Sequence, residues 1–321
     1  MSRTKISILA KRSLIFDRVP RNFRNKILYD QFCTTKSNKA TKEDLETRRR
    51  EVMGRGLPKQ KPIEGVKQIL IVASGKGGVG KSTTSVNLAV ALKMNDPEKQ
   101  VGLLDADVFG PSVPLMMNLD ESPELNAKNM MEPLVNYGVK CMSMGLLVNK
   151  ESAMIWRGLM VMSALDKLIR QVAWGPLDYL IVDTPPGTGD THLSLVQNIP
   201  VDGVLLVTTP QKTALDVTRR GALMYKKLNV PLVGIVENMS SVICPKCNHE
   251  ASLFRDGSLN LAWEMGINIL CKIPINDDIA VGCDSGKPIL VLKPNSRSSE
   301  IYKKLAKDVS QFLQEQRVNA T

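Results

Sequence analysis

Residues 75–83 read Gly75-Lys76-Gly77-Gly78-Val79-Gly80-Lys81-Ser82-Thr83 and follow directly on the apolar run Gln68–Ala73. Glycines let a backbone curl around phosphate oxygens, and a helix that follows presents its positive N-terminal end to them. In this pattern Lys81 reaches the β- and γ-phosphates, and the Ser82 hydroxyl binds Mg²⁺. The segment after the loop is amphipathic, as the motif requires. The sequence therefore predicts a phosphate-binding loop whose contacts to a nucleotide come from residues 75–83.

Strand-like and helix-like segments alternate along the rest of the chain. Continuous apolar runs predict buried strands at Gln68–Ala73, Val101–Leu104, Tyr179–Val182, Gly203–Thr208 and Leu232–Glu237. Helical patterns occupy Gly158–Val172, Thr213–Leu228 and Ser298–Gln314. This alternation predicts an α/β fold of the P-loop NTPase type, a mostly parallel sheet with helices on both faces. Ligands of such a sheet bind at the carboxyl ends of its strands.

Positive charge is concentrated in the first 40 residues, which hold ten Lys/Arg and two Asp/Glu of the chain totals of 43 and 32. The remaining residues hold 33 Lys/Arg and 30 Asp/Glu. This near balance of charge argues against nucleic-acid binding by the part of the chain after residue 40. The tail contains no Glu and places apolar patches among Arg and hydroxyl residues, a pattern typical of a mitochondrial transit peptide. A disordered basic arm is the alternative. No apolar run approaches the ~18 residues that cross a membrane.

The sequence divides into three predicted parts. Residues 1–40 are the transit peptide or disordered arm, which places the mature protein in the mitochondrial matrix. Residues 41–62 form a charged linker that contains Gly54, Gly56 and Pro58. Residues 63–318 form one ATPase domain, which includes a Cys-x-x-Cys segment within residues 240–250.

Three aspartates stand where predicted strands end. Asp105 and Asp107 follow Leu103-Leu104, and Asp183 follows Leu180-Ile181-Val182 and precedes a loop of glycine and proline. Asp183 has the chemistry to hold Mg²⁺ through a water, and Asp105 or Asp107 can orient an attacking water. Each aspartate alone is more often a turn or helix cap. Their shared position beside a phosphate loop predicts a hydrolytic site.

Cys244-Pro245-Lys246-Cys247 supplies two thiolates separated by two residues. A [4Fe–4S] cluster normally takes four cysteines, so two copies of the chain would have to share one cluster across a symmetry axis. Zinc is a rival, with His249 and either Cys271 or Cys283 completing four ligands. A redox-active Cys-x-x-Cys pair is a further alternative, and the residues alone leave the three open.

Lys76 makes the loop similar to the deviant phosphate loop of the MinD/ParA/Mrp class of ATPases. This resemblance implies a homodimer in which Lys76 acts on the partner's nucleotide as a catalytic residue, together with Lys81. It implies that Asp107 aligns the water, that Asp105 supports the magnesium site and that Asp183 is the acid that holds Mg²⁺ with Ser82. The position of Asn238, in Glu237-Asn238-Met239-Ser240, contacts adenine in relatives.

The phosphate loop, the segments Asp105–Ser112 and Asp183–Asp190, and Asn238 followed by Cys-Pro-x-Cys together resemble the Mrp-type iron–sulfur carrier ATPases. The resemblance covers about residues 55–315, and Trp156-Arg157-Gly158 and Asp284–Pro288 also fit it. It implies a slow, switch-like ATPase with ATP, Mg²⁺ and a labile [4Fe–4S] cluster at Cys244 and Cys247. With a mitochondrial tail, it further implies delivery of clusters from upstream assembly machinery to apo-proteins of respiratory complex I.

Two other functions use the same loop. A positioning ATPase of the ParA/MinD kind, with a structural zinc and nucleotide-dependent membrane or DNA binding, would carry a basic amphipathic C-terminal helix. Residues 298–314 instead mix Lys303, Lys304 and Lys307 with acidic neighbours, as in an ordinary solvated face. A metabolic kinase or amidoligase is the third possibility, but the sequence shows no substrate-pocket motif for it.

Overall fold

A computed structural model describes residues 60–147, 158–244, 246–247, 249–254 and 257–320. These residues belong to one compact unit, Pro58–Thr321. The predicted transit peptide at 1–40, nearly all of the predicted linker at 41–62 and the Trp156-Arg157 pair lie outside the described residues. Among the helices of the described part, none has both the length and the apolar character to cross a membrane.

Nine strands form one sheet in the described part of the chain. They are β1 (Val66–Ser74), β2 (Val101–Asp105), β3 (Leu134–Asn136), β4 (Val139–Ser143), β5 (Leu177–Asp183), β6 (Gly203–Thr208), β7 (Leu232–Ile243), β8 (Glu250–Ser252) and β9 (Ile269–Ile275). Their order is β3-β4-β2-β5-β1-β6-β7-β8, and β9 also pairs with β7. Only β3 and β8 pair antiparallel, so the predicted mostly parallel sheet is confirmed. All five predicted strands are present; β3, β4, β8 and β9 were not predicted.

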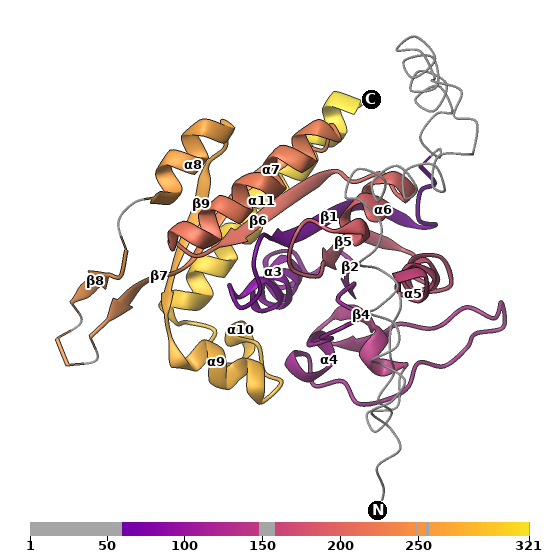
Figure 1. The fold of residues 1–321 in the computed structure, drawn as a ribbon. Helices are drawn as coiled ribbons and strands as arrows, with labels where there is room; N and C mark the ends of the chain where they lie inside the picture. The colour runs from indigo at the N-terminus through magenta and orange to yellow at the C-terminus, as the bar shows by residue number, and fades with distance from the viewer. Residues whose placement is uncertain (1–59, 148–157, 245, 248, 255–256, 321) are drawn as a thin grey trace, which may run out of the picture. The chain divides into compact units, whose positions relative to one another are not determined.

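Helices cover both faces of this sheet, as predicted. One apolar core joins the sheet to α5 (Gly158–Arg170), α6 (Asp190–Asn198), α7 (Lys212–Lys227) and α8 (Gly257–Met265). The other joins it to α3 (Lys81–Asn95), α4 (Val113–Met116), α9 (Asp277–Asp284), α10 (Ile289–Leu292) and α11 (Arg297–Ala320). Figure 1 shows these elements and the β7–β8 hairpin, which reaches out at the left of the view.

Strand β1 is buried on both sides, which explains its continuous apolar run. Ile69, Ile71 and Ala73 pack into the core beneath α5–α8, whereas Leu70 and Val72 pack into the core beneath α3 and α11. Its neighbours are β5 and β6, so the phosphate loop leaves the centre of the sheet. The carboxyl ends of β2 and β5 lie beside it, because Asp105 pairs with Asp183 in the parallel register.

Strand β7 continues past its predicted end at Glu237, and its regular extended backbone is interrupted at Met239. Met239 has a φ of 55°, which a non-glycine residue rarely adopts. The register between β7 and β9 shifts between Asn238 and Val242. Before the break β7 is a buried strand beside β6, and after it the strand forms a hairpin with β8. One strand therefore connects the centre of the sheet to the Cys-x-x-Cys segment.

A buried histidine fixes the loop between β5 and α6. The Nε2 of His192 lies 3.0 Å from the Pro185 carbonyl, and its Nδ1 lies 2.6 Å from the Tyr225 hydroxyl on α7. A neutral ring satisfies both contacts when Nε2 donates to the carbonyl and Nδ1 accepts from the hydroxyl. Burial lowers the pKa of His192 to about 4, and the charge of Lys81 adds to this effect.

The buried His192 makes stability fall in mild acid. An unfolded histidine binds a proton near pH 6.5, whereas folded His192 does so only near pH 4. The contribution of His192 is therefore complete above about pH 6.5 and is lost as pH falls towards 4, by at most about 1.4 kcal/mol per pH unit. Urea unfolding at several pH values should show this slope in the wild type and in His249→Gln, which alters the other, exposed histidine. In His192→Gln the part of the pH dependence of the unfolding free energy that comes from His192 should disappear. An unchanged pH dependence in this variant would contradict the assignment of that part to His192.

Candidate functional site

The phosphate loop takes its shape from two glycines with crowded surroundings. Gly80 has a φ of 83°, and a Cβ there would lie 2.1 Å from the Nδ2 of Asn238. Gly75 lies against α7, where a Cβ would come within 2.5 Å of the backbone nitrogen of Thr218. A side chain at either position would push the loop away from a neighbouring element. The sequence of the loop therefore lets it fit between β7, α7 and the N-terminus of α3.

Beneath the loop, Asp183 is a fully buried carboxylate whose charge is compensated locally. The Lys81 ammonium lies 2.7 Å from its Oδ1, and the Ser85 hydroxyl donates to the same oxygen over 2.6 Å. The Ser82 hydroxyl donates to Oδ2, also over 2.6 Å. A buried charge is stable only when it is paired and hydrogen-bonded, and Asp183 meets both conditions.

These residues fit a magnesium nucleotide. The Ser82 hydroxyl and the Asp183 carboxylate are oxygen donors of the kind that Mg²⁺ takes, and they face each other at the N-terminus of α3. A cavity of about 220 Å³ opens beside them. Its lining combines loop residues with side chains from the two neighbouring strand ends: Ser74, Lys76, Gly77, Gly78, Gly80, Lys81, Ser82, Thr83, Asp107, Ser112, Met116 and Pro186.

Asp105 and Asp107 have different surroundings. Asp107 lines the cavity, whereas Asp105 is buried behind it. The oxygens of Asp105 accept backbone N–H groups of Asp107, Ser112 and Val113 at 3.1–3.2 Å and the Ser143 hydroxyl at 3.0 Å. Burial, with repulsion from Asp183 as a second cause, raises the pKa of Asp105 to about 7. Asp105 thus fixes the loop that carries Asp107, and its support of the magnesium site stays a prediction.

Lys76 is exposed at the mouth of the cavity. Its carbonyl accepts the Ser74 hydroxyl over 3.1 Å, which fixes the backbone on which the side chain stands. No carboxylate among the described residues forms an ion pair with its ammonium group. The backbone of Lys76 is therefore held in place, while its ammonium group is accessible to a second molecule.

Asn238 contacts the phosphate loop itself. Its Nδ2 donates to the carbonyl of Val79 over 2.9 Å, at the point where Gly80 leaves room for it. The contact of Asn238 with adenine stays a prediction. The observed contact joins β7 to the loop, six residues before Cys244 along the chain.

The cysteine pair lies at the tip of the β7–β8 hairpin. The backbone N–H of Cys244 donates to the His249 carbonyl over 2.9 Å and closes the turn. Backbone N–H groups of Cys247 and Lys246 donate to the Cys244 sulfur and lower the pKa of its thiol. Cys244 is half-buried and Cys247 is exposed. The turn therefore presents two accessible sulfurs, and the lowered pKa of Cys244 increases its share of the thiolate form that binds metals.

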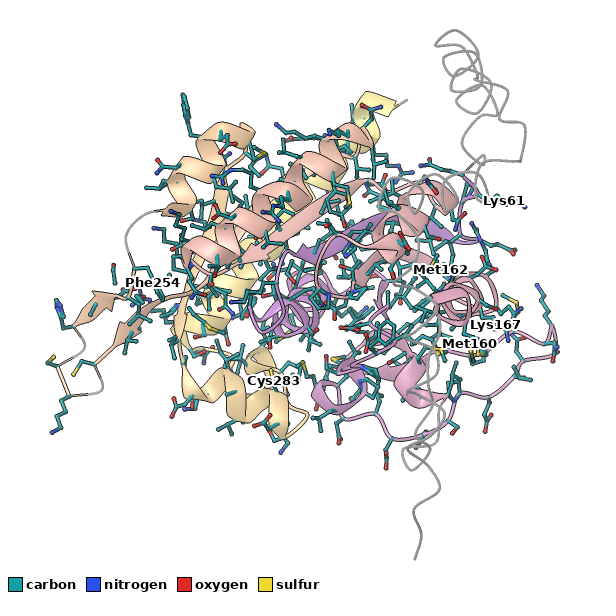
Figure 2. All side chains as sticks on the ribbon, in the orientation of Figure 1. Lys61, Met160, Met162, Lys167, Phe254 and Cys283 are labelled. Carbon is teal, nitrogen blue, oxygen red and sulfur yellow. The ribbon has the colours of Figure 1, made fainter. Side chains whose placement is uncertain are left out.

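The described residues do not bring the predicted zinc ligands together. Cys271 lies in β9, where burial raises the pKa of its thiol to about 12. Cys283 is buried in α9, close to Thr83, and Figure 2 shows it well apart from the hairpin beside Phe254. No group of three or more His, Cys, Asp and Glu side chains in the described part of the chain could hold a metal ion. At the hairpin turn, the described residues therefore offer the sulfurs of Cys244 and Cys247 as metal donors.

Sequence reasoning missed several residues that position the site. Ser85 and Ser143 donate to the two central aspartates, and His192 and Tyr225 hold the loop that follows Asp183. Ser85 could have been found, because it stands one helical turn after Lys81 on the face that carries the loop. Ser143 and Tyr225 could not be found from a local sequence pattern, because each lies more than 30 residues along the chain from the side chain that it contacts.

Comparison with known proteins places this geometry in a family. The sequence model of the ParA group described as "NUBPL iron-transfer P-loop NTPase" matches residues 65–310. The iron-sulfur cluster transfer protein NUBPL of Mus musculus is 54% identical over 275 residues, covering 85% of this chain and 86% of that protein. An Arabidopsis thaliana protein, "iron-sulfur protein required for NADH dehydrogenase, mitochondrial", is 51% identical, covering 80% and 82%.

A solved structure agrees with the sequence comparisons. The nucleotide-binding protein of Archaeoglobus fulgidus in complex with ADP superposes with a TM-score of 0.64 at 33% identity, covering 75% of this chain and 93% of that one. The fold of this chain is thus found in a relative whose structure was solved with ADP. The chain belongs to the NUBPL family of iron-transfer P-loop NTPases.

Proposed function

We propose that this protein is an ATP-dependent carrier of [4Fe–4S] clusters. Two copies hold one labile cluster between their Cys244 and Cys247 pairs and deliver it to apo-proteins, with mitochondrial respiratory complex I as the main recipient. The observation that carries this proposal is the pair of accessible sulfurs with no third metal ligand beside it in the described residues. A cluster that needs four thiolates then needs two chains. The names of the mouse and Arabidopsis relatives support the cargo and the recipient.

The phosphate loop is the nucleotide-binding part of the carrier. Lys81 exchanges its ion pair with Asp183 for the phosphate oxygens of ATP, and the oxygens of Ser82 and Asp183 would hold Mg²⁺. Bound Mg²⁺ supplies positive charge that neutralises the phosphates. Asp107 orients the attacking water from the wall of the cavity, and Asp105 holds the loop on which Asp107 stands.

Hydrolysis in this scheme requires the dimer. Lys76 is exposed and lacks an ion-pair partner among the described residues, so it can reach the nucleotide of the second copy. There it neutralises charge that develops in the transition state, as an arginine finger does. Turnover is slow, because the nucleotide serves as a switch. Asn238 contacts the adenine and the loop carbonyl of Val79 from the strand that leads to Cys244, so one strand senses the nucleotide and holds the thiol.

The predicted parts of the chain agree with this function. A transit peptide at residues 1–40 would bring the protein to the mitochondrial matrix, and residues 41–62 would link it to the ATPase domain at 63–318. There it would receive clusters from the upstream assembly machinery. The word "mitochondrial" in the name of the Arabidopsis relative supports this location.

Loss of either cysteine should abolish cluster binding. After anaerobic reconstitution with iron and sulfide, the wild-type chain should hold about four irons per dimer. Cys244→Ala and Cys247→Ala should each hold essentially none, whereas Cys271→Ala, which alters a thiol outside the pair, should match the wild type. Iron and sulfide analysis with absorption spectroscopy measures this. One zinc per monomer, or a monomeric holo-form that keeps its sulfide, would contradict the proposal.

Lys76 should act in trans. Lys76→Ala should lower kcat by about 10³-fold or more while ADP still binds, because Lys81 and the loop backbone remain. Asp107→Ala should also be inactive. In a mixture of the two variants, each mixed dimer has one intact site, in which Asp107 belongs to one chain and Lys76 to the other.

The activity of this mixture shows whether Lys76 acts in its own nucleotide site or in that of the other subunit. Equal amounts with free subunit exchange should restore about a quarter of wild-type hydrolysis. Phosphate release measures the rate, and a mixture of Lys76→Ala with Lys81→Ala is the comparison. That pair should also regain activity if Lys76 acts across the dimer. Mixtures that stay inactive although mixed dimers form would place Lys76 in its own site.

A further inference from the structure

The outer sides of α7 and α8 form one solvent-facing surface. Both helices pack into the same apolar core on one side of the sheet (Figure 1). The Arg219 guanidinium of α7 forms an ion pair with Glu264 of α8 over 2.8 Å, and the Lys226 ammonium donates to the Met265 carbonyl over 2.7 Å. These contacts hold the two helices side by side, so their exposed residues are neighbours.

An apolar ridge stands on the α8 part of this surface. Trp263 is 88% exposed, and no large apolar side chain among the described residues is more exposed. Leu259, four residues earlier in α8, is 50% exposed. Residues four apart lie on the same side of a helix, so the indole and the leucine form one ridge. A tryptophan ring is highly buried in most folded proteins, so the ridge marks a surface that binds something apolar.

On α7, Leu223 lies among cationic side chains. It is 43% exposed. The positions three and four residues away on a helix are its neighbours, and all four are basic: Arg219, Arg220, Lys226 and Lys227. Arg219 forms ion pairs with Asp216 and Glu264. The other three are exposed and form no ion pair with a carboxylate of the described residues.

The surface is more positive than the rest of the chain after residue 40. Helices α7 and α8 hold five Lys/Arg and two Asp/Glu, which gives +3. Residues 41–321 as a whole hold 33 and 30, which also gives +3. The excess charge of the domain is therefore no larger than that of these two helices. We call the surface formed by their exposed basic and apolar side chains the basic face: Arg220, Leu223, Lys226, Lys227, Leu259 and Trp263.

We propose that the basic face docks on an anionic lipid surface. Lys and Arg side chains attract the phosphates of anionic headgroups, while Trp and Leu enter the boundary between headgroups and acyl chains. Tryptophan suits this boundary because its ring is apolar and its N–H is polar. Such docking goes beyond the carrier function and does not require a bound cluster. It also leaves the other sites free, because the face contains no residue of the Cys-x-x-Cys turn or of the nucleotide cavity.

A lipid surface fits this geometry better than an acidic protein does. At 88% exposure the ring of Trp263 stands out from α8. A protein partner needs a preformed pocket of matching shape for such a ring, whereas lipid headgroups rearrange around it. The long side chains of Lys226 and Lys227 can likewise follow headgroups that move.

Quenching by vesicles tests the docking of the full chain. Vesicles of phosphatidylcholine and phosphatidylglycerol with brominated acyl chains should quench wild-type tryptophan fluorescence, because the inserted indole contacts bromine. Trp263→Ser should lose this quenching although Trp156 and Trp174 remain. Vesicles of phosphatidylcholine alone should not quench, and added salt should weaken the effect by screening the charges. The basic tail at 1–40 is common to every variant, so a difference between variants reports on the basic face.

Charge variants provide a second measurement. In co-sedimentation with the anionic vesicles, Arg220→Gln and Lys227→Gln should each weaken binding about fivefold. The matched controls are Lys304→Gln and Lys307→Gln, which remove exposed charges from α11 on the other side of the sheet and should bind like the wild type. Equal ADP binding shows that all variants are folded.

Three results would overturn the inference. One is quenching of Trp263→Ser that equals that of the wild type. Another is an equal loss of vesicle binding in the α11 variants, since the attraction would then not depend on this face. The third is a Trp263 emission that responds to poly-glutamate and not to the vesicles, which would assign the face to an acidic protein. None of these results bears on whether the chain takes up iron, so the carrier function is tested separately.

Discussion

A carboxylate placed in the interior of the sheet organises the nucleotide site. Asp183 at the end of β5 cannot be ionised there without donors, and Lys81, Ser82 and Ser85 from the first turns of α3 supply them. The same requirement fixes α3 against β5 and holds the phosphate loop between them. A phosphate group and a cation can replace these contacts because both carry the charges that the site already balances. The charges of Asp183 and Lys81 therefore balance each other within the site.

The neighbouring strand end adds the second constraint. Asp105 lies beside Asp183 in register, and the repulsion between two buried carboxylates is relieved by three backbone N–H groups and the Ser143 hydroxyl. The three N–H groups come from the segment that follows β2 and carries Asp107, whereas Ser143 ends β4. A change in charge near Asp183 therefore alters the electrostatic energy of Asp105, and through it the hydrogen bonds that Asp105 accepts from the backbone of that segment. This coupling needs no moving domain, only two aspartates on adjacent strands.

Much of this arrangement could be predicted from the sequence, and the remainder could not for identifiable reasons. The loop at 75–83 and the strands ending in Asp105 and Asp183 have local signatures, so the fold could be predicted, and the residues named from these signatures lie near one another at the strand ends. Their roles at a nucleotide stay predictions. Short strands such as β8 and β9 have mixed polarity and were missed. The backbone N–H groups that Asp105 accepts were not predicted, because such partners cannot be read from sequence spacing. The contact between Asn238 and Val79 depends on the path of β7 beside the loop, which no local pattern encodes.

The break at Met239 has a consequence for how such a protein can change. A left-handed residue and a shift in pairing separate the part of β7 that touches the phosphate loop from the part that ends in Cys244. Insertions or altered turns beyond the break leave the pairing of β7 with β6 in place, because that pairing ends at Glu237. A different turn grafted after Met239 should therefore leave the part of β7 that contacts the phosphate loop unchanged.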